Sequence, residues 1–170
     1  EEKVRLLALY DSLTKLPNRR LFLEHLEQSI QDAEMKKQLG ILLCIDLDNF
    51  KAINDTAGHE TGDYLLQQVA TRLLECVEAN QMVARLGSDE FVVLLDHLGS
   101  SEMEAIPQLE KTAKYILQTL TQPYFLADSE YHNSASIGIS LFGIEACENI
   151  QDPIKRADMA LSDAKNYGRN

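Results

Sequence analysis

Apolar residues recur at intervals of three and four along several segments of the chain, which is the pattern of amphipathic helices. The first such helix is predicted to follow Asn18, a favourable N-cap residue. Its apolar stripe consists of Phe22, Leu26, Ile30 and Ala33. Two further stripes are formed by Leu65, Leu66, Val69, Leu73, Leu74 and Val77, and by Leu109, Ala113, Ile116, Leu117 and Leu120 with Pro107 near the first turn. A last helix is predicted to begin with Asp152 as its N-cap and Pro153 as its first residue, and to close at Gly168.

Shorter apolar runs between these helices predict strands, which cover residues 41–48, 82–86, 89–96 and 131–142. The second and third strands are predicted to form a hairpin whose two-residue turn, Gly87 and Ser88, is of type II′ with positive φ at Gly87. Residues 49–63 predict a loop that contains glycine. Mixed helices and hairpin-connected strands are typical of the α+β class rather than of a wholly parallel sheet.

The chain has 170 residues, of which 45% are hydrophobic, and this predicts a single domain over residues 1–170. Residues 1–13 have helical character and are expected to be the end of a helical linker from an upstream module. No apolar run approaches the ~20 residues that span a bilayer. The formal charge of −11 argues against contact with nucleic acid or an anionic membrane. Three cysteines without a CxxC pair favour a reduced compartment, the cytoplasm, and no zinc site.

Acidic residues gather where two of the predicted strands meet the turn. Side chains alternate along a strand, so Asp46 and Asp48 share a face, while Asp89 and Glu90 lie just past the hairpin turn. If the hairpin pairs with strand 41–48, Asp46 approaches Asp89 or Glu90, and the cluster repels itself unless a cation neutralises it. Mg²⁺ prefers carboxylate oxygens and leaves positions open for substrate phosphates. From the spacing alone, solvated acids at strand ends are an equally good interpretation.

Two common sites are excluded by the residues themselves. DLDNFKAIND is not a calcium-binding EF-hand loop, because Phe50 stands where an oxygen ligand is needed. The chain also lacks GxxxxGK[ST], so it has no P-loop. Any phosphate ligand would therefore depend on a metal or on individual cations.

Five motifs of the chain, in their order and spacing, resemble those of the GGDEF domain of the diguanylate cyclase family. They are DSLTKLPNRR, IDLDNFKAINDTAGHETGD, RLGSDEF, SASIGIS and ADMALSDAKNYGRN, and they span nearly all of the sequence. The resemblance implies a central, mainly antiparallel sheet flanked by helices, as in nucleotidyl cyclases and the polymerase palm. It also implies condensation of two GTP molecules into cyclic di-GMP by a homodimer with facing sites, with Mg²⁺ or Mn²⁺ as cofactor.

The resemblance also assigns roles to single residues. It implies metal ligation by the Asp46, Asp89 and Glu90 carboxylates and the Leu47 carbonyl, with Asp89 and Glu90 as the catalytic acids. For the substrate it implies guanine recognition by Asn54 and Asp63, and phosphate contacts from Phe50, Lys51, Lys165 and Arg169. Without the resemblance, Asp63 would be interpreted as a residue that complements a helix N-terminus, and Lys165 and Arg169 as cations near a helix C-terminus.

The chain departs from the family pattern at several positions. The second glycine of the name motif is Ser88, which adds a hydroxymethyl group close to the nucleotide and puts activity in question. Lys15 replaces a glycine, and Ser162 replaces a tyrosine. At the family's RxxD product-inhibition site the chain reads Glu78, Ala79, Asn80 and Gln81, so we expect no feedback by cyclic di-GMP there.

Two hypotheses of different class follow. The first is a feedback-insensitive diguanylate cyclase. The second is an inactive GTP-binding module that regulates a neighbouring EAL-type phosphodiesterase domain. In either case we expect an upstream sensor and a downstream EAL-type domain in the full-length protein, which itself could be anchored to a membrane.

Overall fold

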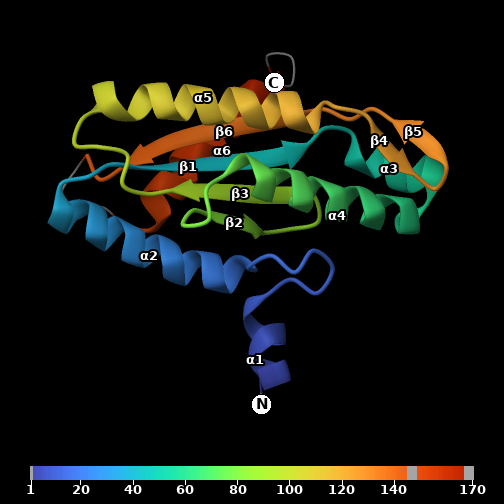
Figure 1. Cartoon of the computed structure of the whole chain (residues 1–170), viewed down its shortest axis with the longest axis horizontal. Helices are drawn as coiled ribbons and strands as arrows, with labels where there is room; N and C mark the ends of the chain where they lie inside the picture. The colour runs from blue at the N-terminus through green and yellow to red at the C-terminus, as the bar shows by residue number, and fades with distance from the viewer. Residues whose placement is uncertain (1, 145–148, 167–170) are drawn as a thin grey trace.

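The computed structural model describes residues 2–144 and 149–166, and its centre is a four-stranded sheet flanked by helices (Figure 1). The helices are α1 (Glu2–Leu9), α2 (Arg19–Lys36), α3 (Phe50–Ala57), α4 (His59–Cys76), α5 (Glu102–Leu120) and α6 (Gln151–Asn166). The strands are β1 (Gly40–Leu47), β2 (Met82–Arg85), β3 (Glu90–Leu95), β4 (Tyr124–Leu126), β5 (Ser129–Tyr131) and β6 (Ala135–Phe142). The sheet order is β2-β3-β1-β6, and each neighbouring pair is antiparallel. The expected α+β class with a central antiparallel sheet is confirmed.

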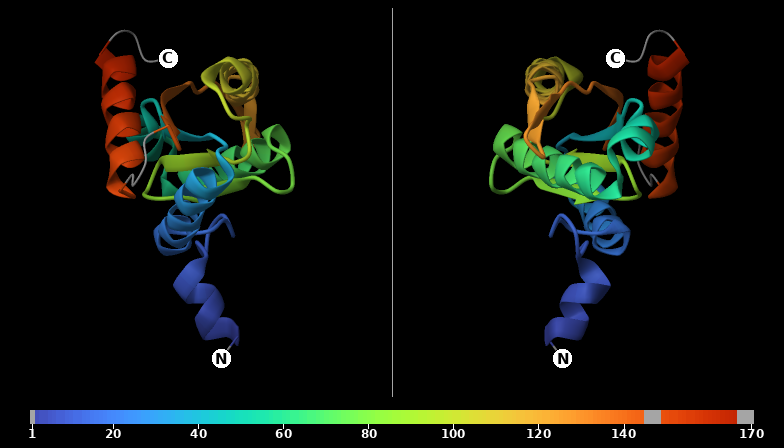
Figure 2. Two further views of the ribbon diagram at one scale, coloured as in Figure 1. Left: turned by 90° about the vertical axis from the view of Figure 1, so that its left-hand side faces the viewer. Right: turned by 90° about the vertical axis from the view of Figure 1, so that its right-hand side faces the viewer.

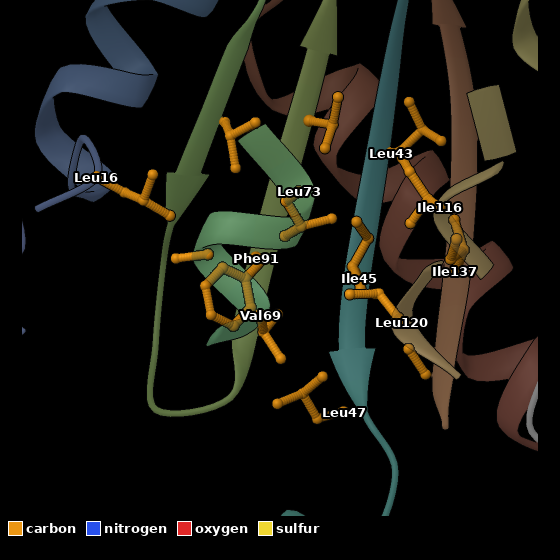
Figure 3. Close-up of a cluster of buried hydrophobic side chains, with 14 of the residues drawn as sticks. Leu16, Leu43, Ile45, Leu47, Val69, Leu73, Phe91, Ile116, Leu120 and Ile137 are labelled. Atoms are coloured by element: carbon orange, nitrogen blue, oxygen red, sulfur yellow. The ribbon is translucent and has the colours of Figure 1, made fainter. Parts of the chain in front are cut away.

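Alternation along β1 divides the core into two layers. One set of its side chains, Ile41, Leu43, Ile45 and Leu47, packs with residues of α4 and α5, among them Val69, Leu73, Ile116 and Leu120 (Figure 3). Leu42 and Cys44 point to the other face, where they pack with residues of α2 and α6. Figure 2 shows α4 and α6 on opposite sides of the sheet. The strand is therefore buried on both faces, which explains its unbroken apolar run.

Most of the predicted helical stripes lie in the core. The α2 stripe is buried, and Asn18 caps this helix by accepting a bond of 3.1 Å from the Leu21 amide. The α4 stripe was predicted too long, because Leu74 is exposed and Val77 follows the last helical residue. Pro107 also lies deeper in α5 than predicted, since the helix already begins at Glu102.

Several predicted boundaries were wrong. Residues 49–63 do not form a loop but contain α3 and the start of α4. The strand predicted at 131–142 begins only at residue 135. Asp152 is not the N-cap of α6, because the helix begins at Gln151, whose amide donates to the Asn149 side chain. The predicted end of α6 at Gly168 lies outside the described residues.

The first helix stands apart from the rest of the molecule. No residue of α1 is buried, and the helix points away from the sheet (Figures 1 and 2). Its C-terminal end is tied to the start of α2, because Asn18 donates to the carbonyls of Ala8 and Leu9 at 3.0 and 2.9 Å. In the connection, Lys15 has φ 65°, so it occupies the left-handed conformation that glycine adopts most easily.

Within residues 2–144 and 149–166, no helix combines the length and the apolar character that a bilayer span requires.

Candidate functional site

Strand pairing brings the predicted acids together. Asp46 of β1 lies directly opposite Glu90 of β3, and opposite residues of an antiparallel pair share one face of the sheet. The Leu47 amide donates to the Asp89 carbonyl at 3.2 Å, which places the hairpin loop beside the end of β1. The expectation that the hairpin approaches Asp46 is therefore confirmed.

Asp46 occupies an unusual electrostatic position. Its Oδ2 atom lies 2.6 Å from Lys165 Nζ of α6, whereas its Oδ1 atom is buried and has no hydrogen-bond partner in the described structure. Burial raises the pKa of Asp46 to about 6; the Lys165 ammonium opposes this rise and the neighbouring Asp89 carboxylate adds to it. The acid is thus held in a state in which a bound cation would find a free oxygen.

A pocket of about 270 Å³ opens next to these acids, between β1, β3, α2 and α6. Its lining combines apolar side chains with the charged groups Arg19, Asp46, Glu90, Asp158 and Lys165. Ser162, which stands where the family has tyrosine, also lines it. The acidic end of the sheet therefore borders a recess, at which Asp46 is largely shielded from solvent whereas Glu90 is exposed.

The hairpin loop differs from the predicted turn. The Leu86 amide donates to the Glu90 carbonyl at 2.9 Å, so the loop contains three residues, Gly87, Ser88 and Asp89. Gly87 does not have the positive φ that the predicted type II′ turn requires. The Ser88 hydroxyl donates to Asp89 Oδ1 at 3.2 Å, so the residue that replaces the family glycine contacts one of the predicted metal ligands.

Asn54 and Asp63 lie on two helices that pack against each other. Asn54 is in α3, and Asp63 is an exposed residue in the first turns of α4. A Cβ atom on Gly62 would lie 1.9 Å from Asn54 Oδ1, so the absence of a side chain at Gly62 makes room for the Asn54 amide. The crossing of α3 and α4 therefore fixes the place of Asn54, and Asp63, the other predicted guanine contact, follows Gly62 directly on α4.

The predicted phosphate contacts lie at the start of α3 and the end of α6. Phe50 and Lys51 are the first two residues of α3, and within the described chain the Asn49 side chain makes no capping bond to them. Lys51 is exposed and Phe50 is buried. Lys165 is in the last turn of α6, whereas Arg169 lies outside the described residues.

Asp48, which the alternation rule placed beside Asp46, has a structural role instead. Its carboxylate is buried and accepts bonds from the hydroxyls of Ser134 and Ser136 at 2.6 and 2.8 Å. These bonds fix the segment between β1 and α3 to the start of β6. Because both of its oxygens are engaged, Asp48 is not a candidate ligand.

A metal ion would have to be held by few side chains. Within residues 2–144 and 149–166, no three His, Cys, Asp or Glu side chains already converge as a cage. The free oxygen of Asp46, the nearby Asp89 and Glu90, and a backbone carbonyl such as that of Leu47 nevertheless suit Mg²⁺, which keeps several waters and takes one or two carboxylates.

In the stretch that corresponds to the RxxD motif, Glu78 and Gln81 make hydrogen bonds within the protein. The Gln81 side chain pairs with the backbone of Asp96, accepting from its amide at 2.8 Å and donating to its carbonyl at 3.4 Å. Glu78 is exposed, and its carbonyl accepts from the Gln81 amide at 3.0 Å. A cavity of about 360 Å³ between this stretch and α5 is lined by both residues.

Sequence reasoning missed three residues around the acids. Arg85 and Asp11 form an ion pair of 3.0 Å next to the hairpin loop, and Arg19 lines the pocket. A signal for Arg85 was present, since it is a cation at the end of an apolar strand, directly before the loop. Nothing in the spacing indicated that Asp11, 74 positions earlier in the chain, lies beside it.

Comparison with known proteins gives a consistent family. The family model described as "Diguanylate cyclase, GGDEF domain" matches residues 8–170. The chain is 41% identical to the bifunctional diguanylate cyclase/cyclic di-GMP phosphodiesterase MucR of Pseudomonas aeruginosa, over 96% of this chain and 23% of MucR. It is 38% identical to the cyclic di-GMP phosphodiesterase PdeR of Escherichia coli, over 99% of this chain and 24% of PdeR. The chain thus spans about a quarter of the length of these relatives.

Solved structures agree with this result. The GGDEF domain of TpbB from Pseudomonas aeruginosa superposes with a TM-score of 0.86 at 37% identity, covering 94% of this chain and 90% of that chain. The diguanylate cyclase SiaD from the same species, solved with its activator SiaC, superposes with a TM-score of 0.85 at 28% identity, covering 99% and 62%.

Proposed function

The chain belongs to the diguanylate cyclase family of GGDEF domains, and on that premise we propose that it condenses two GTP molecules into cyclic di-GMP with release of two pyrophosphates. The observation that carries the proposal is the acidic end of the sheet: Asp46, with one oxygen buried and unpartnered, faces Glu90 and the Asp89 loop beside a pocket. One relative is named for both cyclase and phosphodiesterase activity and another for phosphodiesterase activity alone. The proposal therefore rests on the residues of the site and not on the names of the relatives.

Asp46, Asp89, Glu90 and the Leu47 carbonyl would hold Mg²⁺ or Mn²⁺. Bound there, the metal would supply charge stabilisation at the α-phosphate and the leaving pyrophosphate. In each of the two condensation steps the 3′-hydroxyl of one GTP forms a bond to the α-phosphorus of the other, and the bond to pyrophosphate breaks. The hydroxyl proton would pass to one of the acids of this site, Asp89 or Glu90.

Lys165 has a double role in this proposal. Without ligand its ammonium neutralises Asp46 at 2.6 Å. When a cation takes over that task, Lys165 becomes free to bind a phosphate of GTP, together with Arg169 and the backbone amides of Phe50 and Lys51. Asn54 and Asp63 would read the guanine, because an amide can pair with its acceptor edge and a carboxylate accepts from its N–H groups.

Catalysis further requires a homodimer, because each site holds a single GTP and the two GTP molecules must face each other. We therefore expect the rate per chain to rise with protein concentration when no other part of the protein brings the two domains together. An upstream sensor and a downstream EAL-type domain fit relatives about four times as long as this chain. We place the domain in the cytoplasm, where GTP is available.

A second function is favoured by Ser88. Its hydroxyl binds Asp89, one of the carboxylates that the metal needs, and its side chain projects where the family has none. If this contact persists with substrate, the domain binds GTP without turnover and regulates an EAL-type neighbour.

Product analysis with GTP and Mg²⁺ over a range of protein concentrations separates the two functions. Cyclic di-GMP from the native chain, lost in Asp46→Asn and retained in the matched surface variant Asp128→Asn, supports the cyclase. Product from Ser88→Gly but not from the native chain supports the regulatory module. Absence of both product and GTP binding in native protein and Ser88→Gly alike would contradict both proposals.

A further inference from the structure

Arg85 holds the backbone of the loop that carries the acids. This residue ends β2, and only 14% of its side chain is exposed. Its Nε atom donates to the Gly87 carbonyl at 3.0 Å and its Nη2 atom to the Ser88 carbonyl at 2.8 Å. Both residues of the loop that precede Asp89 are therefore fixed through their carbonyl groups.

The guanidinium is itself anchored by Asp11. Arg85 Nη1 lies 3.2 and 3.0 Å from the two carboxylate oxygens of Asp11. Asp11 in turn accepts bonds from the Thr14 amide at 2.9 Å and the Thr14 hydroxyl at 2.7 Å. Burial alone would raise the pKa of Asp11, but the bonds from Thr14 and Arg85 hold that pKa below its ordinary value.

The backbone reinforces the same connection. The Arg85 amide donates to the Pro17 carbonyl at 3.0 Å, and the Asp11 amide donates to the Leu16 carbonyl at 2.7 Å. Residues 11–17 therefore form a hydrogen-bonded turn to which Arg85 is attached. Because a guanidinium donates in a planar fork, one arginine can bind the carboxylate and both carbonyls together, which a lysine ammonium cannot reproduce in that geometry.

We propose that Arg85, anchored by Asp11, is a positioning residue that fixes the Gly87 and Ser88 carbonyls and thereby places Asp89 and Glu90 for metal binding. The inference rests on the proposed function, because it assigns Arg85 a role in that metal site. Arg85 touches neither the substrate nor the metal. Its effect should appear in metal affinity and turnover more than in GTP recognition, which depends on Asn54 and Asp63 in other elements.

The test measures Mn²⁺ binding by electron paramagnetic resonance, without nucleotide, in the native chain, Arg85→Lys and Asp11→Asn. The matched control is Arg72→Lys, because Arg72 also donates to three backbone carbonyls, those of Thr119, Gln122 and Pro123, in a different part of the molecule. Thermal unfolding of each variant sets a temperature at which all are folded. Steady-state kinetics with GTP then separate kcat from KM.

We expect Arg85→Lys to weaken Mn²⁺ binding by about tenfold or more, as removal of outer-shell support commonly does, with lower kcat and a nearly unchanged KM. Asp11→Asn should shift Mn²⁺ binding in the same direction, and Arg72→Lys should leave it at the native level. Native-like Mn²⁺ binding in folded Arg85→Lys and Asp11→Asn, or an equal loss in Arg72→Lys, would overturn the inference. Asp46→Asn distinguishes failure of the Arg85 inference from failure of the proposed function. Native-like Mn²⁺ binding in that variant would overturn the proposed metal site itself.

Discussion

Asp46 combines two conditions that favour metal binding by a carboxylate, partial burial and an incomplete set of hydrogen-bond partners. One oxygen is paired with Lys165, and the other is buried without a partner. A buried acceptor without a hydrogen bond costs free energy in the ligand-free protein. That cost is recovered when a cation binds, which makes the residue a better ligand than a solvated acid of the same type.

The raised pKa of Asp46 leads to a stability prediction with a definite sign. Its pKa is about 6 in the folded protein against 3.8 ordinarily, so the favourable contribution of protonated Asp46 is complete below about pH 4 and is lost as the pH rises through about 6. Asp46→Asn avoids this loss of stability, because the asparagine side chain stays uncharged at every pH. In metal-free buffer with a chelator, the variant should exceed the native chain in unfolding free energy at pH 8 by on the order of 1 kcal/mol, and the difference should shrink toward pH 4.

Thermal unfolding at a series of pH values measures this difference. Excess Mg²⁺ at pH 8 should reverse the order, because only the native carboxylate gains a bound cation. A native chain that is more stable than Asp46→Asn at pH 8 without metal would show that the Lys165 ion pair outweighs the burial of Asp46, contrary to the prediction.

The residue scale also shows what the sequence could and could not predict. Alternation along a strand predicted the face on which Asp46 lies, because side-chain period is a local property, but its approach to the hairpin acids depended on the pairing of β1 with β3, which the sequence left as a condition. The loop type was not predictable in this way. Gly87 and Ser88 suit a two-residue turn, but Arg85 binds both of their carbonyls and the loop takes three residues. Its anchor, Asp11, is remote in sequence.

At the scale of elements, α3 was missed for a physical reason. It has only eight residues, so its apolar face of Phe50, Ile53 and Ala57 is shorter than the stripes that identified the longer helices. Its position comes instead from packing on α4, where Phe50 Cζ and the Asn54 amide both lie close to Gly62. Sequence patterns detect long amphipathic helices, whereas an eight-residue helix between Asn49 and Gly58 is easily interpreted as a loop.

The α3–α4 crossing yields a prediction for nucleotide binding. In Gly62→Ala the new methyl group would lie 1.9 Å from Asn54 Oδ1, so the amide must move away from its place. We expect GTP affinity, measured by calorimetry, to fall by about tenfold, the worth of one hydrogen bond to a buried polar group. Ala is a better helix former than Gly, so the helix itself should not weaken.

A suitable control is Thr71→Ala on the same helix, whose exposed hydroxyl donates to the Gln67 carbonyl. It should bind GTP as the native chain does. Equal GTP affinity in Gly62→Ala and the native chain would mean that Asn54 does not contact the base.

At the scale of the whole molecule, the class of fold followed from the sequence, but the layering did not. Hairpin-connected strands and amphipathic helices predict α+β, since each signal is local. Which helix covers which face depends on long-range contacts, such as the close approach of α6 to Gly138 of β6, where a Cβ atom would lie 2.1 Å from the Ala157 carbonyl oxygen. The same close packing carries Lys165 to Asp46, a pairing of residues 119 positions apart by number (165 − 46) that no pattern indicated.

The acidic site and the stretch at Glu78 and Gln81 are separate regions of the molecule, and the second leads to a prediction about regulation. An arginine and an aspartate at these positions would bind a cyclic dinucleotide, but Glu78 brings negative charge toward its phosphates and Gln81 is committed to the Asp96 backbone. We therefore expect the initial rate of GTP turnover to be unchanged by added cyclic di-GMP at concentrations well above those of the protein. The paired substitution Glu78→Arg with Gln81→Asp should introduce binding but should also loosen the backbone at Asp96, directly after β3, so its thermal stability must be measured alongside. Saturable binding of cyclic di-GMP by the native chain that disappears in Glu78→Ala would contradict the prediction, because it would mean that an acid at this position assists recognition of an anionic ligand.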